Sequence, residues 1–393
     1  MTYRPAFLLI VFFIETLGED MSIYNISLGL LSLSCFVLPL ILISFFSNEN
    51  SSLKKNIFLY FSLLIVMIFI VGGYAWVVVS GNYVKNSMFY GVIYNALGLL
   101  FMFHIYTFIT SLFTGGVYKL LGKYISKYKK PLGVLTIVIP AIAVSYGFIK
   151  AQTYEVTRLV FNTSNSSGPV VFAHIPDLHL GHQRGADYLA KVIKSAEDAG
   201  ADFILYNGDL FDSNVALNES VLQVLSSAKI PQFYTTGNHE FYMDTQRALN
   251  LLHSAGVRIL SSEVVKINGI QLVGLEYMNA DRKSHDPHSV NSLYMDERLP
   301  KIAVDRSEPI ILAHHSPVGI DYAKNFGADI YVAGHTHGGQ VFPATLLVGK
   351  SFPYYQGVNE YQGMKMVVSE GAGTFGPWMR LGSRNEIQII TVN

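Results

Sequence analysis

Long apolar runs that are nearly free of charge fill the first 150 residues and limit what this part of the chain can fold into. A helix needs about 20 mostly apolar residues to cross the hydrocarbon core of a bilayer. Four runs reach or approach that length: 22–46, 57–79, 88–113 and 132–149. A shorter run, 6–17, carries Glu15 and lacks a small-residue cleavage site of the kind that ends a removed signal peptide. We therefore expect an all-α, multi-pass transmembrane domain over 1–150 with about five helices, or four spans if the first run does not cross.

Charge divides the chain at about residue 150. Residues 1–150 hold four acids and ten bases, which leaves 24 acids and 18 bases for the remainder, so formal net charges of +6 and −6 cancel. Eleven of the twelve histidines also lie beyond residue 150. A mean hydropathy of +0.33 with 14% charged residues excludes a disordered chain and a basic nucleic-acid binder. The sole cysteine, Cys35, excludes a disulfide framework and a thiolate metal site.

Lysines in the short loops predict the orientation in the membrane. Residues 114–130 carry five lysines and 47–56 carry two, whereas 80–87 carries one. Because Lys and Arg in short loops mark the cytoplasmic side, we place 114–130 inside, and the last span then runs outward. We expect a multi-pass protein of the cytoplasmic membrane in which everything after Lys150 is extracytoplasmic.

The second part of the chain has the pattern of one mixed α/β domain. Residues 151–168 are polar and predict a linker, and 169–393 has the length of a single domain. Short β-branched runs predict strands at 170–175, 202–206, 232–235, 270–275, 309–313, 329–333, 364–369 and 386–392. Amphipathic stretches predict helices at about 185–199, 216–228, 244–255 and 320–326. Asp244 is the expected N-cap of the third helix.

Five of the predicted strands are each followed by a short turn with polar side chains that can bind a metal. These turns carry Asp177 and His179; Asp209 and Asp212; Asn238, His239 and Glu240; His314 and His315; and His335 and His337. Side chains at the carboxyl ends of neighbouring strands converge on one edge of an α/β sheet. Carboxylate, imidazole and amide ligands without thiolate suit Mn, Fe or Zn better than Mg or Ca. One Asp-x-His pair would be weak evidence, but five such turns in succession predict a metal site.

These motifs resemble the calcineurin-like metallophosphoesterase superfamily. The ending 371–387 and the Gly-His-Thr-His-Gly-Gly-Gln run at 334–340 look like its bacterial membrane-anchored branch. The resemblance covers about 168–393. It implies an α/β domain with four layers, α-β-β-α, in which two packed sheets carry a dinuclear metal site at one edge.

Carried onto this chain, the resemblance implies a role for each site residue. One divalent metal would be held by Asp177, His179, Asp209 and His337, and the other by the bridging Asp209 with Asn238, His314 and His335. Two such ions, with Mn²⁺ favoured and Fe or Zn as alternatives, would lower the pKa of a shared water, whose hydroxide would attack phosphorus. His239 would protonate the leaving oxygen or hold a phosphate oxygen. Asp212 would orient His239.

Other positions have weaker indications. Glu370 stands where the family often has a basic residue, which puts a highly charged substrate in doubt. Arg380 is a candidate phosphate contact, with a structural ion pair as the alternative. His315 is a candidate substrate-facing residue, with surface exposure as the alternative.

We expect a membrane-anchored dinuclear-metal phosphoesterase that cleaves a phosphodiester or a phosphomonoester. A lipid or lipid-linked substrate is favoured, because the short linker keeps the site near the headgroups of the bilayer. The alternatives are an extracytoplasmic phosphodiesterase for nucleotides or other soluble esters, and a non-catalytic metal-binding sensor. The presence of both His239 and Asp212 favours the enzyme. The expected partners are the lipid bilayer and the substrate; no nucleic acid is expected, and the sequence does not indicate an oligomeric state.

Overall fold

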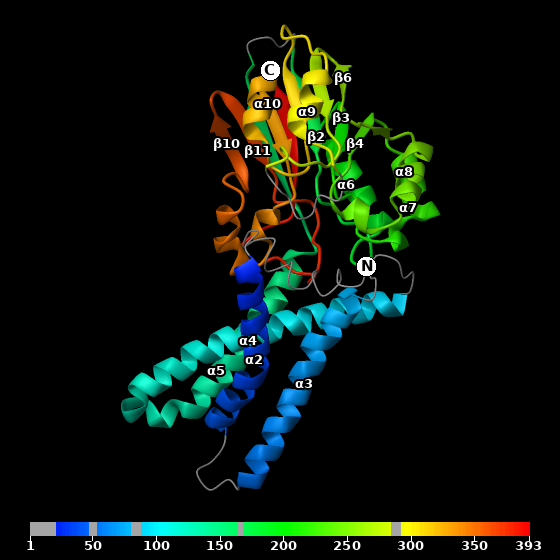
Figure 1. The fold of residues 1–393 in the computed structure, drawn as a ribbon. Helices are drawn as coiled ribbons and strands as arrows, with labels where there is room; N and C mark the ends of the chain where they lie inside the picture. Colours follow the sequence, from blue (N-terminus) through cyan, green and yellow to red (C-terminus); the bar gives the residue numbers. More distant parts are fainter. Residues whose placement is uncertain (1–20, 47–52, 80–87, 164–167, 284–291) are drawn as a thin grey trace.

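The chain forms a helical part followed by an α/β part (Figure 1). A computed structural model describes residues 21–46, 53–79, 88–163, 168–283 and 292–393. The helical part contains α2 (Met21–Phe46), α3 (Leu53–Val79), α4 (Met88–Ile125) and α5 (Lys129–Lys150). A single 3-10 turn, Ser126–Tyr128, joins α4 to α5.

The number of helices that are apolar and long enough to span a membrane differs from the expected five. Within the described ranges, two segments are long and apolar enough to cross a membrane, Lys55–Trp76 and Tyr90–Lys150. The second combines the predicted runs 88–113 and 132–149, because the lysine-bearing segment between them is also helical. Leu33–Phe46 in α2 is a shorter apolar helix, and the predicted run 6–17 lies outside the described residues.

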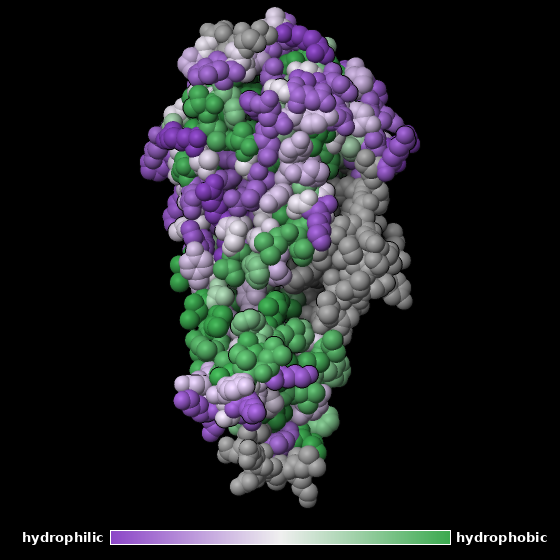
Figure 2. Space-filling view, turned by 90° about the vertical axis from the view of Figure 1, so that its left-hand side faces the viewer, coloured by the Kyte–Doolittle hydropathy of each residue, from purple (hydrophilic) through white to green (hydrophobic). Residues whose placement is uncertain are grey.

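The surface of the helical part is largely apolar. Figure 2 shows hydrophobic side chains over the lower, helical half and mainly hydrophilic ones over the α/β half. Phe58, Phe69 and Leu120 are each at least two-thirds exposed, which suits a lipid environment and not water. Polar side chains inside this part pair between helices, as in the 2.8 Å contact of Ser34 Oγ with His104 Nε2.

The α/β part consists of two six-stranded sheets. The first has the order β1 (Glu155–Phe161), β12 (Glu386–Val392), β2 (Val170–His174), β3 (Phe203–Asn207), β4 (Gln232–Thr235) and β5 (Arg258–Ile259). The second has the order β10 (Gly357–Tyr361), β11 (Met364–Val368), β9 (Ile330–Ala333), β8 (Ile310–Ala313), β7 (Ile270–Gly274) and β6 (Glu263–Ile267). Strands β2 to β5 run parallel in the first sheet, and β7, β8, β9 and β11 run parallel in the second.

The cores give these sheets and helices a four-layer arrangement. Along β3, Phe203 and Leu205 pack between the sheets, whereas Ile204 and Tyr206 face the opposite side, as the two-residue period of a strand requires. The outer side of the first sheet packs against α6 (Ala186–Asp198), α7 (Glu219–Ser226) and α8 (Thr245–Ser254). The outer side of the second packs against α9 (Met295–Arg298) and α10 (Ile320–Phe326).

The predicted elements of this part are largely present. All eight predicted strands and all four predicted helices have counterparts, and the side chain of Asp244 caps α8 by accepting from Arg247 N at 3.1 Å. Residues 151–168 were predicted as a linker, but they contain β1. This strand pairs in parallel with β12 from Glu155 to Phe161. Only four residues therefore separate the end of α5 from the first strand.

Candidate metal centre

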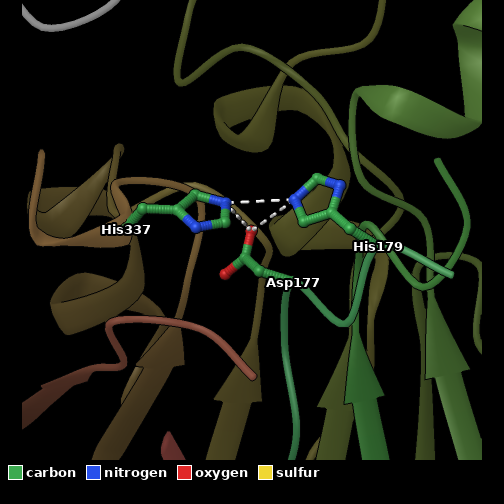
Figure 3. A group of neighbouring side chains, drawn as sticks. All are labelled: Asp177, His179 and His337. Atoms are coloured by element: carbon green, nitrogen blue, oxygen red, sulfur yellow. Dashed lines mark hydrogen bonds and ion pairs between the residues drawn. The ribbon is translucent and has the colours of Figure 1, made fainter. Parts of the chain in front are cut away.

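The predicted ligands converge where the parallel strands of both sheets end. The loops after β2, β3 and β4 in the first sheet, and after β8 and β9 in the second, carry them. Figure 3 shows strand arrows pointing toward a group formed by Asp177, His179 and His337. The motifs scattered over 160 residues of sequence thus meet at one edge of the sheets, as expected.

One group of possible ligands surrounds Asp177. His337 Nε2 lies 3.4 Å from Asp177 Oδ1, and His179 Nε2 lies 4.0 Å from the same oxygen. The two imidazole Nε2 atoms are 3.0 Å apart (Figure 3). All three side chains are buried. One carboxylate oxygen and two imidazole nitrogens therefore lie close enough together to bind the same metal ion.

A second and a third group share Asp209. Its Oδ2 lies 3.1 Å from His315 Nε2 and 3.9 Å from the Nε2 atoms of both His179 and His239. His335 extends the group containing His315, because its ring also offers a ligand atom within 4.8 Å of the others. Asp209 thus belongs to two groups of possible ligands at once.

Asn238 and His335 lie on the same side of the site. His335 Nδ1 is 3.0 Å from Asn238 Oδ1. The backbone N–H of His335 donates to Asp177 Oδ2 at 2.9 Å, which ties the loop after β9 to the loop after β2. The structure therefore brings together eight of the nine predicted ligands and catalytic residues.

The ninth, His314, lies differently from the expectation of a metal ligand, because its ring faces the backbone and not the carboxylates of the site. His314 Nε2 accepts from Met278 N at 3.2 Å and its Nδ1 donates to Ser316 O at 2.7 Å, so backbone groups occupy both ring nitrogens. The next residue, His315, was expected to face the substrate or the surface, but it is fully buried and lies beside Asp209. His315 Nδ1 donates to Asn207 O at 2.8 Å, which turns the other ring nitrogen, Nε2, toward Asp209 Oδ2 at 3.1 Å.

Arg380 is also placed differently from the prediction of a phosphate contact. Its side chain is fully buried, and its Nη2 donates to the carbonyls of Glu370 and Gly373, both at 2.6 Å. Its Nη1 donates to His337 O at 2.7 Å, and its Nε donates to Asn385 Oδ1 at 2.8 Å. Arg380 therefore lies behind His337 and fixes three loop segments to one another, with no donor left for a substrate.

His239 and Asp212 form the predicted pair. His239 Nδ1 lies 2.9 Å from Asp212 Oδ1, so the carboxylate accepts the Nδ1–H and the Nε2 atom faces Asp209. Burial by itself would raise the pKa of Asp212, but hydrogen bonds from His179 and His239 outweigh it and hold that pKa below its ordinary value. Asp212 is therefore a stable anion that orients two imidazoles.

Five of these residues have a strained backbone. Asp177, His179, Asp209, His335 and His337 all have φ between 50° and 71°, a region that residues other than glycine rarely occupy. Adjacent glycines make room for them: a Cβ on Gly237 would lie 2.0 Å from Asp209 Oδ1. Such strain concentrates at functional sites, where surrounding contacts hold it in place.

Two further residues belong to the site: Glu240, which was not assigned a role from the sequence, and Phe375, one of several aromatic residues after the metal motifs that could line an apolar approach. Glu240 Oε2 accepts from the backbone N–H groups of Gly237 at 2.8 Å and Asp209 at 3.1 Å, so it joins the loops after β3 and β4. Its place next to His239 in the Gly-Asn-His-Glu motif was the available signal. Phe375 packs with ring-centroid distances of 4.9 to 5.7 Å against His179, His239 and His337. No pattern in the sequence separates it from other aromatic residues.

The electrostatics of the group fit a cation. Burial by itself would raise the pKa values of Asp177 and Asp209, but the neighbouring imidazoles hold both below the ordinary value. Burial would lower the pKa of His315, but Asp209 and Asp177 outweigh it and raise that pKa to about 9. Buried carboxylates surrounded by imidazole nitrogens are suited to bind divalent metal ions, which take the place of any protons these groups share. The residues present therefore fit a two-metal site.

Comparisons with known proteins agree with this geometry. Residues 170–339 match the family model described as calcineurin-like phosphoesterase. A metallophosphoesterase of Helicobacter pylori is 33% identical over 218 residues, 54% of this chain and 57% of that protein. A zebrafish (Danio rerio) transmembrane protein with a metallophosphoesterase domain is 29% identical over 276 residues, 66% of this chain and 62% of that protein.

Those two matches thus span somewhat more than half the length of each relative. A metallophosphoesterase of Aquifex aeolicus is covered more fully, with 30% identity over 249 residues, 62% of this chain and 91% of that protein. The site geometry and these matches lead to one conclusion. This chain belongs to the calcineurin-like phosphoesterase family.

Proposed function

We propose that this protein is a membrane-anchored hydrolase that cleaves a phosphoester with the help of two divalent metal ions. The observation that carries the proposal is the position of Asp209, whose Oδ2 is within 4 Å of the Nε2 atoms of His179, His239 and His315. Two groups of possible ligands that share a carboxylate are what a bridged pair of metals needs.

The side chains of the site divide into two sets. Asp177, His179, Asp209 and His337 would hold one metal, and Asp209, Asn238, His315 and His335 would hold the other. When bound, such a pair supplies a nucleophile from water at neutral pH and stabilises charge on the phosphate oxygens. Mn²⁺ is our first choice, with Fe and Zn as alternatives, since the ligands are carboxylate, imidazole and amide.

His239 is the proposed general acid, which protonates the leaving oxygen of the ester. With its Nδ1–H held by Asp212 at 2.9 Å, His239 presents Nε2 to the site and can give a proton from that atom to the leaving oxygen. Asp212 keeps the ring in this orientation and stabilises its protonated form. Phe375 covers three of the imidazoles and limits access of bulk water.

Anchoring by the helical part is the basis for the proposed location and substrate. We place the α/β part on the outer face of the cytoplasmic membrane, with several helices crossing the bilayer. Because only four residues separate α5 from β1, the site stays close to the helices that hold it. An ester that lies in the membrane, such as a phospholipid or a lipid-linked sugar phosphate, would be concentrated at this position.

Full-length protein in detergent, supplied with Mn²⁺, tests the activity. We expect it to cleave a p-nitrophenyl phosphodiester or monoester, and we expect a chelator to abolish the cleavage. Asp209→Ala and Asn238→Ala should each lose at least about a hundredfold in kcat/KM, since each removes a metal ligand. Near-wild-type turnover by both variants would exclude the two-metal mechanism.

One further variant separates an enzyme from a non-catalytic metal-binding sensor. His239→Ala should keep the metal content of the wild type and lose turnover. A variant that keeps both would leave His239 without a catalytic role and would favour the sensor. Comparing phospholipid with soluble nucleotide esters as substrates then decides between a membrane substrate and the alternative of an extracytoplasmic nucleotide phosphodiesterase.

A further inference from the structure

One face of α4 lies directly against the α/β part. Gly91, Asn95 and Gly98 share this face, because residues four and three apart in a helix lie above one another. A Cβ on Gly91 would lie 2.7 Å from His182 Nδ1, and a Cβ on Gly98 would lie 3.4 Å from the Cα of Pro377. Between them, Asn95 Nδ2 donates to His182 O at 3.4 Å. Larger side chains at the two glycines would therefore push the α/β part away.

The two loops that α4 touches are the loops of the metal centre. His182 closes the loop after β2 that carries Asp177 and His179. Pro377 follows two residues after Phe375, whose ring lies on the imidazoles of the site. We define the segment 374–379 as the Phe375 loop. Its backbone at Pro377 is the point of closest approach to Gly98.

The Phe375 loop is also held by α5. The backbone N–H of Arg380, directly after the loop, donates to Gly147 O at 2.9 Å. The rings of Trp378 and Phe148 meet edge to face at 5.4 Å, and Met379 is fully buried against Gly147, where a Cβ would meet its side chain. The loop is thus clamped between α4 and α5, with only its Phe375 end facing the metal centre.

We propose that α4, through Gly98, positions the Phe375 loop, and that Phe375 forms the wall against which an apolar substituent of the ester lies. The helical part would then position a loop of the site in addition to anchoring the protein. Gly98 acts as a positioning residue, and Phe375 is the residue that contacts substrate. The second half of this proposal rests on the proposed phosphoesterase function, whereas the first half does not.

Tryptophan fluorescence tests the positioning without any turnover. The chain has two tryptophans, Trp76 and Trp378, so a Trp76→Phe background leaves only the one in the Phe375 loop. In this background we compare Gly98→Leu with Gly116→Leu, a change in the same helix where a Cβ would meet nothing within 4 Å. We expect Gly98→Leu to shift the emission of Trp378 and Gly116→Leu to leave it unchanged.

The milder Gly98→Ala variant covers the case in which Gly98→Leu does not fold. Its Cβ would press on the ring of Tyr74 at 3.2 Å and only touch Pro377 Cα at 3.4 Å, so we expect a shift of Trp378 emission that is smaller than that of Gly98→Leu. Equal emission spectra for the Gly98 and Gly116 variants would overturn the proposed positioning.

Substrate selectivity tests the role of Phe375. Bis(p-nitrophenyl) phosphate and methyl p-nitrophenyl phosphate have the same leaving group and differ only in the second substituent. We expect the full-length wild type to prefer the aryl diester, and we expect Phe375→Ala and Gly98→Leu to reduce that preference about tenfold. Loss of stability alone would lower both rates equally and leave the ratio unchanged.

The outcomes separate the two proposals. An unchanged ratio in Phe375→Ala, with an active wild type, would overturn the substrate wall and leave the phosphoesterase standing. A wild type that contains its metals and cleaves neither ester would contradict the phosphoesterase, while the fluorescence comparison would still decide whether α4 positions the loop.

Discussion

Two adjacent histidines, His314 and His315, have opposite hydrogen-bond environments, and these environments favour His315 over His314 as a metal ligand. In a neutral imidazole only one nitrogen has a lone pair. His314 uses that lone pair to accept from Met278 N, whereas His315 donates from Nδ1 to Asn207 O and turns Nε2 toward Asp209, where a metal can replace the proton on that nitrogen. The sequence shows two neighbouring histidines after a strand and cannot show which way each one points.

Replacing these two histidines in turn tests the assignment. His315→Gln should lose one metal per protein and at least about a hundredfold in kcat/KM, since it removes a ligand. His314→Gln should keep both metals and stay within about tenfold of the wild-type kcat/KM, although removal of its backbone contacts will lower the melting temperature. Metal content and kinetics of the two variants give the answer, and the reverse pattern would restore His314 as the ligand.

His174 offers a test of pH dependence that does not involve metal. It is fully buried, and burial lowers its pKa to about 4 from an ordinary value of 6.5. Below pH 6.5 the unfolded chain binds this proton and the folded protein does not, so stability falls as the pH drops from 6.5 to 4. The loss is up to about 3 kcal/mol.

Thermal unfolding with chelator present measures this contribution. His174→Gln should show a smaller fall in melting temperature between pH 6.5 and 4 than the wild type. His253→Gln, at an exposed position, should follow the wild type. Parallel curves for all three proteins would show that His174 does not contribute to the acid sensitivity.

At the scale of elements, burial explains which strands the sequence predicts. Strands β3, β4, β8 and β9 are buried along their whole length, and their apolar runs mark them clearly. The edge strand β1 contains Glu155, Thr157 and Arg158 on a mostly exposed surface, and this composition is typical of a linker. Only pairing with β12, more than 200 residues later, makes it a strand. The local sequence pattern therefore predicted the loops that carry the possible ligands, and it did not predict the edge strand β1.

Arg184 joins elements from both parts of the chain. Its side chain is buried, its Nη2 donates to Ala151 O at 2.6 Å just after α5, and its Nη1 donates to Thr374 Oγ1 at 2.7 Å in the Phe375 loop. Arg184→Met should lower the stability by about 2 kcal/mol, because it removes two charged hydrogen bonds inside the protein. Arg282→Met, at an exposed ion pair, should leave the melting temperature unchanged. Equal melting temperatures for the two variants would contradict the role of Arg184.

At the scale of the whole molecule, the two parts share an apolar core. Tyr74, Tyr94 and Phe101 of the helical part form one buried cluster with Val341 and Met379 of the α/β part. Tyr106 in α4 adds a hydrogen bond of 2.7 Å to Phe342 O. The charge contrast between the two parts was visible in the sequence, but this joint core was not, because it depends on packing between distant segments. Such a core holds the site at a fixed place relative to the helices.

The orientation of the whole molecule in the membrane is the last prediction. Five lysines of 114–130 lie at or near the turn between α4 and α5, and the α/β part follows the other end of α5. If this turn is cytoplasmic, as lysines in short loops favour, the α/β part is outside.

Reporter fusions after residues 125 and 165 should report opposite compartments, with the second extracytoplasmic. Changing the five lysines to asparagine should weaken that bias, whereas the same change at exposed Lys229 and Lys301 should not. A cytoplasmic signal after residue 165 would place the metal centre inside the cell. The proposal of a substrate at the outer face of the membrane would then be wrong.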